Sequence, residues 1–141
     1  MNKVITLLIL LFAWPVHAYE FAEKWTWEDT AFESVFVVLA VVDWGQTRWM
    51  AERNYKWDGI QYPECNPILG NKPSTGKVDF LIPLGIIFHG FISMALPSKY
   101  HVIAGEYEYD IYPRKIWQYI WIGFEGATVL GNNSLGARIE F

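Results

Sequence analysis

The stretch FLIPLGIIFHGFISMAL, residues 80–96, decides the fold class. It contains one ionisable residue, His89, in an otherwise apolar run. Its length is close to what a helix needs to cross a hydrocarbon core about 30 Å thick. A backbone in lipid must satisfy its own hydrogen bonds, which favours a helix. We therefore predict a transmembrane helix over residues 80–96.

Two further segments have the same character. Residues 31–50 contain a continuous apolar run, and Thr30 and Glu33 before and within it have the spacing of a helix-starting capping box. Residues 116–131 contain one glutamate and are somewhat short for a span. Together the three segments predict an all-α fold, a small helical transmembrane bundle with three mature spans.

The N-terminal sequence, residues 1–18, has the features of a secretory signal peptide. Lys3 precedes an apolar run over 4–13, Trp14-Pro15 interrupts it, and small residues end at Ala18. Cleavage there would leave residues 19–141 as a single integral membrane domain. An uncleaved N-terminal anchor is the alternative, and it gives the same threading.

Two other architectures compete with a helical bundle. The alternating LGARIEF ending at Phe141 resembles the end of an outer-membrane barrel, yet the main apolar runs do not alternate. The apolar runs could also form the core of a soluble exported protein. Aromatic residues flanking the segments, such as Trp25, Trp27, Trp49 and Trp57, favour membrane interfaces instead.

Charge predicts the orientation and restricts the partners. Basic residues gather after the first span, which places that loop in the cytoplasm; they are Arg48, Arg53, Lys56, Lys72 and Lys77. The mature N-terminus and the loop 98–113 would then be periplasmic and the C-terminus cytoplasmic, in a bacterial inner membrane. Tyr and Ile alternate with acids after Gly105, which predicts a short β-hairpin in the outer loop. A net charge of −4 without a basic block disfavours nucleic acid and leaves the lipid bilayer as the expected partner.

Each predicted span carries a residue that is costly in lipid. Asp43, His89 and Glu125 have polar neighbours at helical spacing, so each helix has one polar stripe. If the stripes face one another, the carboxylates meet in the inner leaflet. The candidate polar cluster consists of Asp43, Gln46, Thr47, Glu64, Asn66, His89, Glu125, Asn132 and Asn133.

The loop sequence YPECNPILG, residues 62–70, adds a candidate to this cluster. Asn66 and Pro67 suit the start of a short helical turn that ends at Gly70. Such a turn could bring Glu64 to Asp43, His89 and Glu125, a set able to hold Zn, Mn or Fe. A solvated Glu64 on a capped interfacial turn is the plainer reading. Cys65 is the single cysteine, which excludes an intrachain disulfide.

The same residues carry a resemblance. The pattern D-x-x-Q-T followed by E-x-N-P-[IL]-L-G is similar to that of an uncharacterised family of small bacterial and prophage membrane proteins. The resemblance covers roughly residues 28–141 and implies a common architecture and a shared polar cluster without implying a reaction. It rests on Asp43, Gln46, Thr47, Glu64, Asn66, Pro67, Gly70, Pro73, Ser74, His89, Leu96, Pro97, Glu125, Asn133 and Gly136.

Three functional hypotheses follow from these patterns. The first is a non-enzymatic membrane protein, an envelope accessory or phage-related component, with structural or binding polar stripes. The second is an intramembrane metal-dependent hydrolase that uses Asp43, Glu64, His89 and Glu125. The third is a proton or ion pathway in a homo-oligomer, assembled through the small-residue face of Gly123, Ala127 and Gly131.

Overall fold

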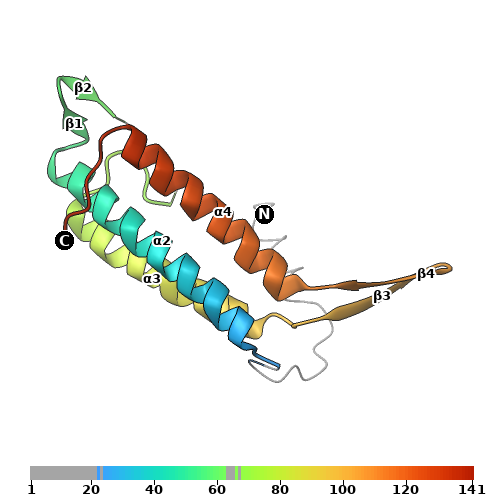
Figure 1. Cartoon of the computed structure of the whole chain (residues 1–141). Helices are drawn as coiled ribbons and strands as arrows, with labels where there is room; N and C mark the ends of the chain where they lie inside the picture. Colours follow the sequence, from blue (N-terminus) through green and yellow to red (C-terminus); the bar gives the residue numbers. More distant parts are fainter. Residues whose placement is uncertain (1–21, 23, 63–65, 67) are drawn as a thin grey trace, which may run out of the picture.

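The computed structural model of the chain describes residues 22, 24–62, 66 and 68–141. In this part of the chain, three long helices lie side by side in an elongated bundle: α2 (Trp27–Glu52), α3 (Thr75–Ala95) and α4 (Pro113–Ser134) (Figure 1). Consecutive helices run in opposite directions, and α2 packs against both of the others. The predicted helical fold is therefore confirmed at this level, whereas the predicted signal peptide over 1–18 lies outside the described residues.

The start of α2 differs from the prediction. Thr26 is the N-cap, and it forms a capping box with Asp29: Asp29 N donates to Thr26 Oγ1 at 3.2 Å, and Thr26 N donates to Asp29 Oδ2 at 2.8 Å. The predicted box of Thr30 and Glu33 is wrong because the same spacing of threonine and acid occurs one turn earlier. Glu33 is consequently free to turn toward the bundle interior.

A β-hairpin lies at each end of the bundle. Strands β3 (Tyr100–Ala104) and β4 (Tyr107–Ile111) pair antiparallel and project beyond one end, which confirms the hairpin predicted within residues 98–113 (Figure 1). At the other end, β1 (Lys56–Trp57) and β2 (Ile60–Gln61) form a smaller hairpin. Asp58 and Gly59 both have positive φ, as an Asp-Gly hairpin turn requires.

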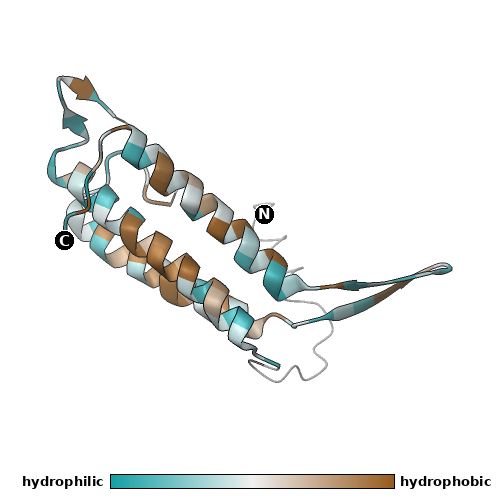
Figure 2. Cartoon of the chain, viewed as in Figure 1, coloured by the Kyte–Doolittle hydropathy of each residue, from teal (hydrophilic) through white to brown (hydrophobic). Residues whose placement is uncertain are grey.

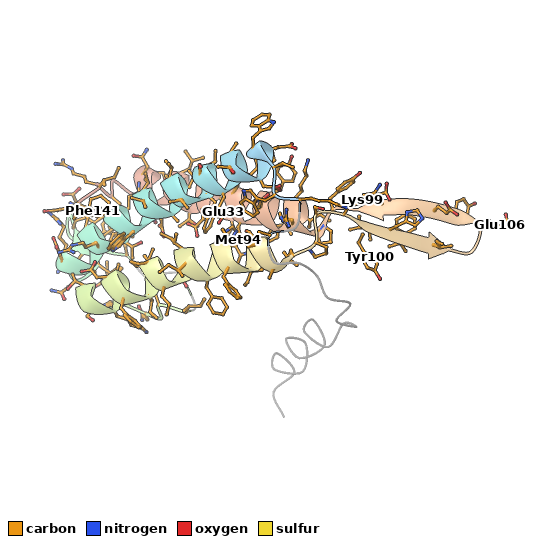
Figure 3. The ribbon with its side chains drawn as sticks, turned by 90° about the horizontal axis from the view of Figure 1, so that it is seen from below. Glu33, Met94, Lys99, Tyr100, Glu106 and Phe141 are labelled. Atoms are coloured by element: carbon orange, nitrogen blue, oxygen red, sulfur yellow. The ribbon has the colours of Figure 1, made fainter. Side chains whose placement is uncertain are left out.

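The C-terminal tail, residues 137–141, returns along α2. Glu140 N donates to Gly45 O at 3.2 Å, and the Phe141 ring meets Trp44 edge-on. A Cβ on Gly45 would lie 2.6 Å from Ile139 Cγ2, so the tail can approach α2 this closely because position 45 has no side chain. Phe141 therefore lies at the end of the bundle opposite the β3–β4 hairpin (Figure 3).

Many polar side chains lie inside the bundle, beside apolar residues such as Phe36, Ala40 and Trp49. The buried polar or charged residues of the described chain are Asp29, Asp43, Gln46, Thr47, His89, Ser93, Arg114 and Gln118. Large apolar side chains lie outside on all three helices, for example Ile87, Phe88 and Leu130. Figure 2 shows apolar residues, in brown, along much of the length of the helices.

One helix in the described part of the chain, α3, is long and apolar enough by itself to cross a membrane. By the same criterion, α2 and α4 do not qualify, so the composition of single helices supports one span where the sequence analysis predicted three.

Candidate functional site

The buried polar residues form two separate groups. The hairpin-end cluster, near β3–β4, consists of Asp29, Glu33, His89, Ser93, Arg114 and Gln118. The tail-end cluster, near the C-terminal tail, consists of Asp43, Gln46, Thr47, Glu125 and Asn132. Both follow from one pattern, because inward positions recur at alternating spacings of four and three along α2 and α4, and polar residues occupy most of them.

A carboxylate–imidazole pair lies in the hairpin-end cluster. His89 Nδ1 lies 2.8 Å from Glu33 Oε1, and the His89 side chain is 4% exposed. Its ring stacks on Phe36 at a centroid distance of 3.6 Å and faces Trp117 at 5.3 Å. Aromatic rings thus fix the imidazole orientation, and His89 Nε2 has no hydrogen-bond partner among the described residues.

Arg114 connects all three helices at this end of the bundle. Its Nε donates to Ser93 O at 3.0 Å and its Nη2 donates to Leu96 O at 2.9 Å, which satisfies carbonyls at the C-terminal end of α3. Its Nη1 reaches Asp29 Oδ2 on α2 at 3.4 Å. The Arg114 side chain is 1% exposed, so a complete charge pair is buried where the helices meet.

Gln118 links α4 to Asp29 and Glu33 of α2. Its Nε2 donates to the Asp29 carbonyl at 3.2 Å and to Glu33 Oε2 at 3.4 Å. The Glu33 carboxylate therefore receives hydrogen bonds from α3 and from α4 together. This network orders the three helices relative to one another.

The tail-end cluster is centred on Asp43, which is 7% exposed. Asn132 Nδ2 donates to Asp43 Oδ1 at 2.7 Å, and Thr47 Oγ1 donates to the same oxygen at 3.4 Å. Gln46 Nε2 donates to a carbonyl of α4 at 3.4 Å. Glu125 lies seven residues before Asn132, on the same face of α4. The hydrogen bonds of Asp43 with Thr47 and Asn132 join members of the predicted polar cluster at this end of the bundle.

His89 is absent from this tail-end cluster, contrary to the prediction. Its partner Glu33 precedes Asp43 by ten positions on α2, a separation of about 15 Å along the helix axis. The predicted grouping of His89 with Asp43 and Glu125 is therefore wrong. Residue spacing within α3 does not specify how α3 aligns with α2, and packing between the helices sets that alignment.

Among the described residues, the predicted metal ligands do not lie together in one site. No group of three or more His, Cys, Asp or Glu side chains suited to a metal ion occurs in this part of the chain. Asp43 and Glu125 share the tail-end cluster, His89 lies in the other, and Glu64 falls outside the described residues. The expected binding of Zn, Mn or Fe consequently has no assembled donor set among the described residues.

The remaining predicted residues lie at the edges of the bundle. Asn66 Oδ1 accepts from the backbone N–H of Ile68 at 2.9 Å, and Gly70 N donates to Asn66 O, so Asn66 begins a turn as predicted. Asn133 is exposed near the end of α4, where its carbonyl accepts from Gly136 N. Neither joins the two buried clusters through these contacts.

Sequence reasoning missed Asp29 and Arg114 as interior residues. Both lie near helix N-termini, where charged residues are normally exposed. A signal was present, because Asp29 precedes Glu33 by four residues and Arg114 precedes Gln118 by four. Extending the polar stripes of Asp43 and Glu125 toward the helix N-termini would have found them.

Comparisons with protein-family models, curated proteins and solved structures find no match for this chain. The resemblance to small bacterial and prophage membrane proteins therefore stays a prediction.

Proposed function

We propose that this chain is a small, multi-spanning inner-membrane protein without an enzymatic site, in which the two buried polar clusters hold the helices together. The observation that carries the proposal is the combination of buried polar clusters with an apolar exterior. The interior of the bundle contains ion pairs and amides, and its exterior carries large apolar side chains such as Ile87 and Phe88. Water-soluble proteins rarely expose contiguous apolar surfaces of this kind.

The burial of polar side chains also bears on α2 and α4. The polar side chains that lower the average hydropathy of these helices, such as Asp43 and Gln118, are buried against their neighbours. Lipid would meet outward residues such as Val38, Ile120 and Leu130. Ionisable residues in spanning helices face the protein interior in this way. This supports three spans although α2 and α4 fail as isolated spans.

The arrangement of the ends supports the proposed threading. The β1–β2 hairpin and the C-terminal tail share one end, and the β3–β4 hairpin projects from the other (Figure 1). The basic residues Lys56, Lys72 and Lys77 belong to the chain between α2 and the start of α3, so the positive-inside rule assigns the tail end to the cytoplasm. The β3–β4 hairpin would then stand in the periplasm.

The two other functional hypotheses find less support. The proposed metal hydrolase needs His89 beside Asp43, and these residues lie in different clusters. A proton or ion pathway needs polar continuity, and the apolar side chains of Phe36 and Ala40 are buried on α2 between the clusters. Homo-oligomerisation stays part of the proposal, because a Cβ on Gly123 or Gly131 would meet open space.

Two single-cysteine variants test the proposal in cells. In a Cys65→Ser background, Glu106→Cys places a thiol at the tip of the β3–β4 hairpin and Lys72→Cys places one before α3. We expect a membrane-impermeant maleimide to label Glu106→Cys in intact cells, and Lys72→Cys only after permeabilisation. Labelling of both in intact cells would contradict the threading. Extraction of the protein by alkaline carbonate would contradict integral membrane insertion.

A further inference from the structure

An open groove runs between the first half of α2 and the end of α3. Its volume is about 440 Å³, and it is lined by Trp25, Thr30, Glu33, Ser34, Val37, Val38 and Met94. Figure 3 shows Glu33 and Met94 in the same part of the bundle, toward the β3–β4 hairpin. A second hollow of about 270 Å³ shares Ser34 and Val38 with the groove and extends it to Leu39.

The groove is apolar along its length and polar at one place. Val37, Val38 and Met94 supply apolar walls, and the continuation past Val35 to Leu39 is apolar as well. From Thr30 to Leu39 the path follows α2 for about 13 Å. These dimensions suit a flexible hydrocarbon chain lying along the helix.

Glu33 supplies the one charge among the groove-lining residues. Two other polar groups at this end are satisfied within the protein, because Trp25 Nε1 donates to Thr30 Oγ1 at 2.9 Å and Ser34 Oγ donates to Thr30 O at 2.7 Å. The Glu33 side chain remains 15% exposed, with Oε1 lying 2.8 Å from His89 Nδ1 and Oε2 accepting from Gln118 Nε2 at 3.4 Å. A carboxylate fixed in this way favours a ligand with a positively charged hydrogen-bond donor.

The position of Glu33 along α2 favours a membrane lipid as the occupant. Glu33 lies six residues after Trp27, about 9 Å along α2. If Trp25 and Trp27 mark the membrane interface, the carboxylate lies where headgroups meet acyl chains and the apolar groove continues deeper. A lipid that places an ammonium group at Glu33 and an acyl chain along Val38 is an aminophospholipid.

We propose that this groove binds a phosphatidylethanolamine molecule of the outer leaflet, with its ammonium at Glu33 and one acyl chain along Val37, Val38 and Leu39. The inference rests on the proposed insertion of the chain in a membrane. It assigns Glu33 and His89 a binding role in addition to helix packing.

The test uses the full chain in vesicles made of equal amounts of phosphatidylethanolamine and phosphatidylglycerol. Each sample contains a trace of one photoactivatable lipid, either the amine or the glycerol type. Val38→Trp fills the groove at a side chain that is 62% exposed, so the bundle interior is untouched. Glu33→Gln removes the charge at nearly constant size. Leu130→Trp, at an exposed site on α4, is the matched control.

We expect wild type and Leu130→Trp to crosslink the amine lipid about tenfold more than the glycerol lipid, as one charge-assisted contact predicts. Val38→Trp and Glu33→Gln should both lose this preference. Equal labelling of the two lipids by wild type, or an unchanged preference in Val38→Trp, would overturn the inference, even if Glu33→Gln fails to fold. A chain that floats with vesicles but shows no preference contradicts this inference alone, whereas one that does not float contradicts the proposed function as well.

Discussion

Replacing Arg114 with methionine tests whether the hairpin-end cluster holds the bundle together. The substitution keeps much of the side-chain length and removes the guanidinium, leaving the Asp29 carboxylate buried without this partner. The carbonyls of Ser93 and Leu96 lose their donors at the same time. Breaking a buried ion pair by removing one partner typically costs about 3–5 kcal/mol. We expect a loss of unfolding free energy in that range.

Lys115→Met is the matched control. Lys115 is the next residue along α4, carries the same charge, and pairs with Glu28 on the same helix as Asp29, with Lys115 Nζ at 2.6 Å from Glu28 Oε2. That pair is open to solvent, and exposed pairs contribute little. The two variants therefore differ mainly in whether the broken pair is buried.

The assay is unfolding of the purified protein in mixed micelles by increasing sodium dodecyl sulfate, followed by circular dichroism. Adding Asp29→Asn to Arg114→Met should recover part of the loss, because it removes the stranded charge. A loss in Arg114→Met no greater than that in Lys115→Met would refute the reasoning. Other contacts would then hold the helices together, and the hairpin-end cluster would contribute little to the free energy of unfolding.

The tail end of the bundle and the β3–β4 hairpin give three further predictions. Gly45→Ala should release the C-terminal tail to carboxypeptidase without loss of helix content, whereas Gly85→Ala, whose added Cβ meets nothing within 4 Å, should match wild type. Asn132→Leu should cost about 1–3 kcal/mol in the same unfolding assay, because a buried carboxylate loses its donor; a neutral result would remove that contact from the account. A hydrogen bond from Lys99 lowers the pKa of Asp110 below its ordinary 3.8, so the stability this pair adds to the β3–β4 hairpin is present above that pH and lost as the pH falls through the lowered pKa. The protection of the hairpin amides, measured relative to their intrinsic exchange rates at each pH, should therefore fall in acid, and an equal fall in Asp110→Asn would show that the pair is not responsible.

The helices and one hairpin could be predicted from local sequence patterns, whereas the composition of the two buried polar clusters could be predicted only in part. Helix positions depend on local patterns, so the three apolar segments fell within or close to α2, α3 and α4. The signal for the β3–β4 hairpin was also local, with its turn at Gly105 and alternating residues in its strands. The β1–β2 hairpin had an equally local signal in Asp58-Gly59 that the sequence reading did not use.

The sequence by itself determined which residues are costly to bury and on which helix face they lie. Periodicity placed Asp43, Gln46 and Thr47 on one face of α2 and Glu125 and Asn132 on one face of α4, and these faces do meet. The tertiary structure decided how the helices align along their axes, and therefore which residues of one helix lie beside which residues of another. That alignment pairs His89 with Glu33, because helix registry depends on packing between segments far apart in the chain, and residue spacing within a segment does not contain it.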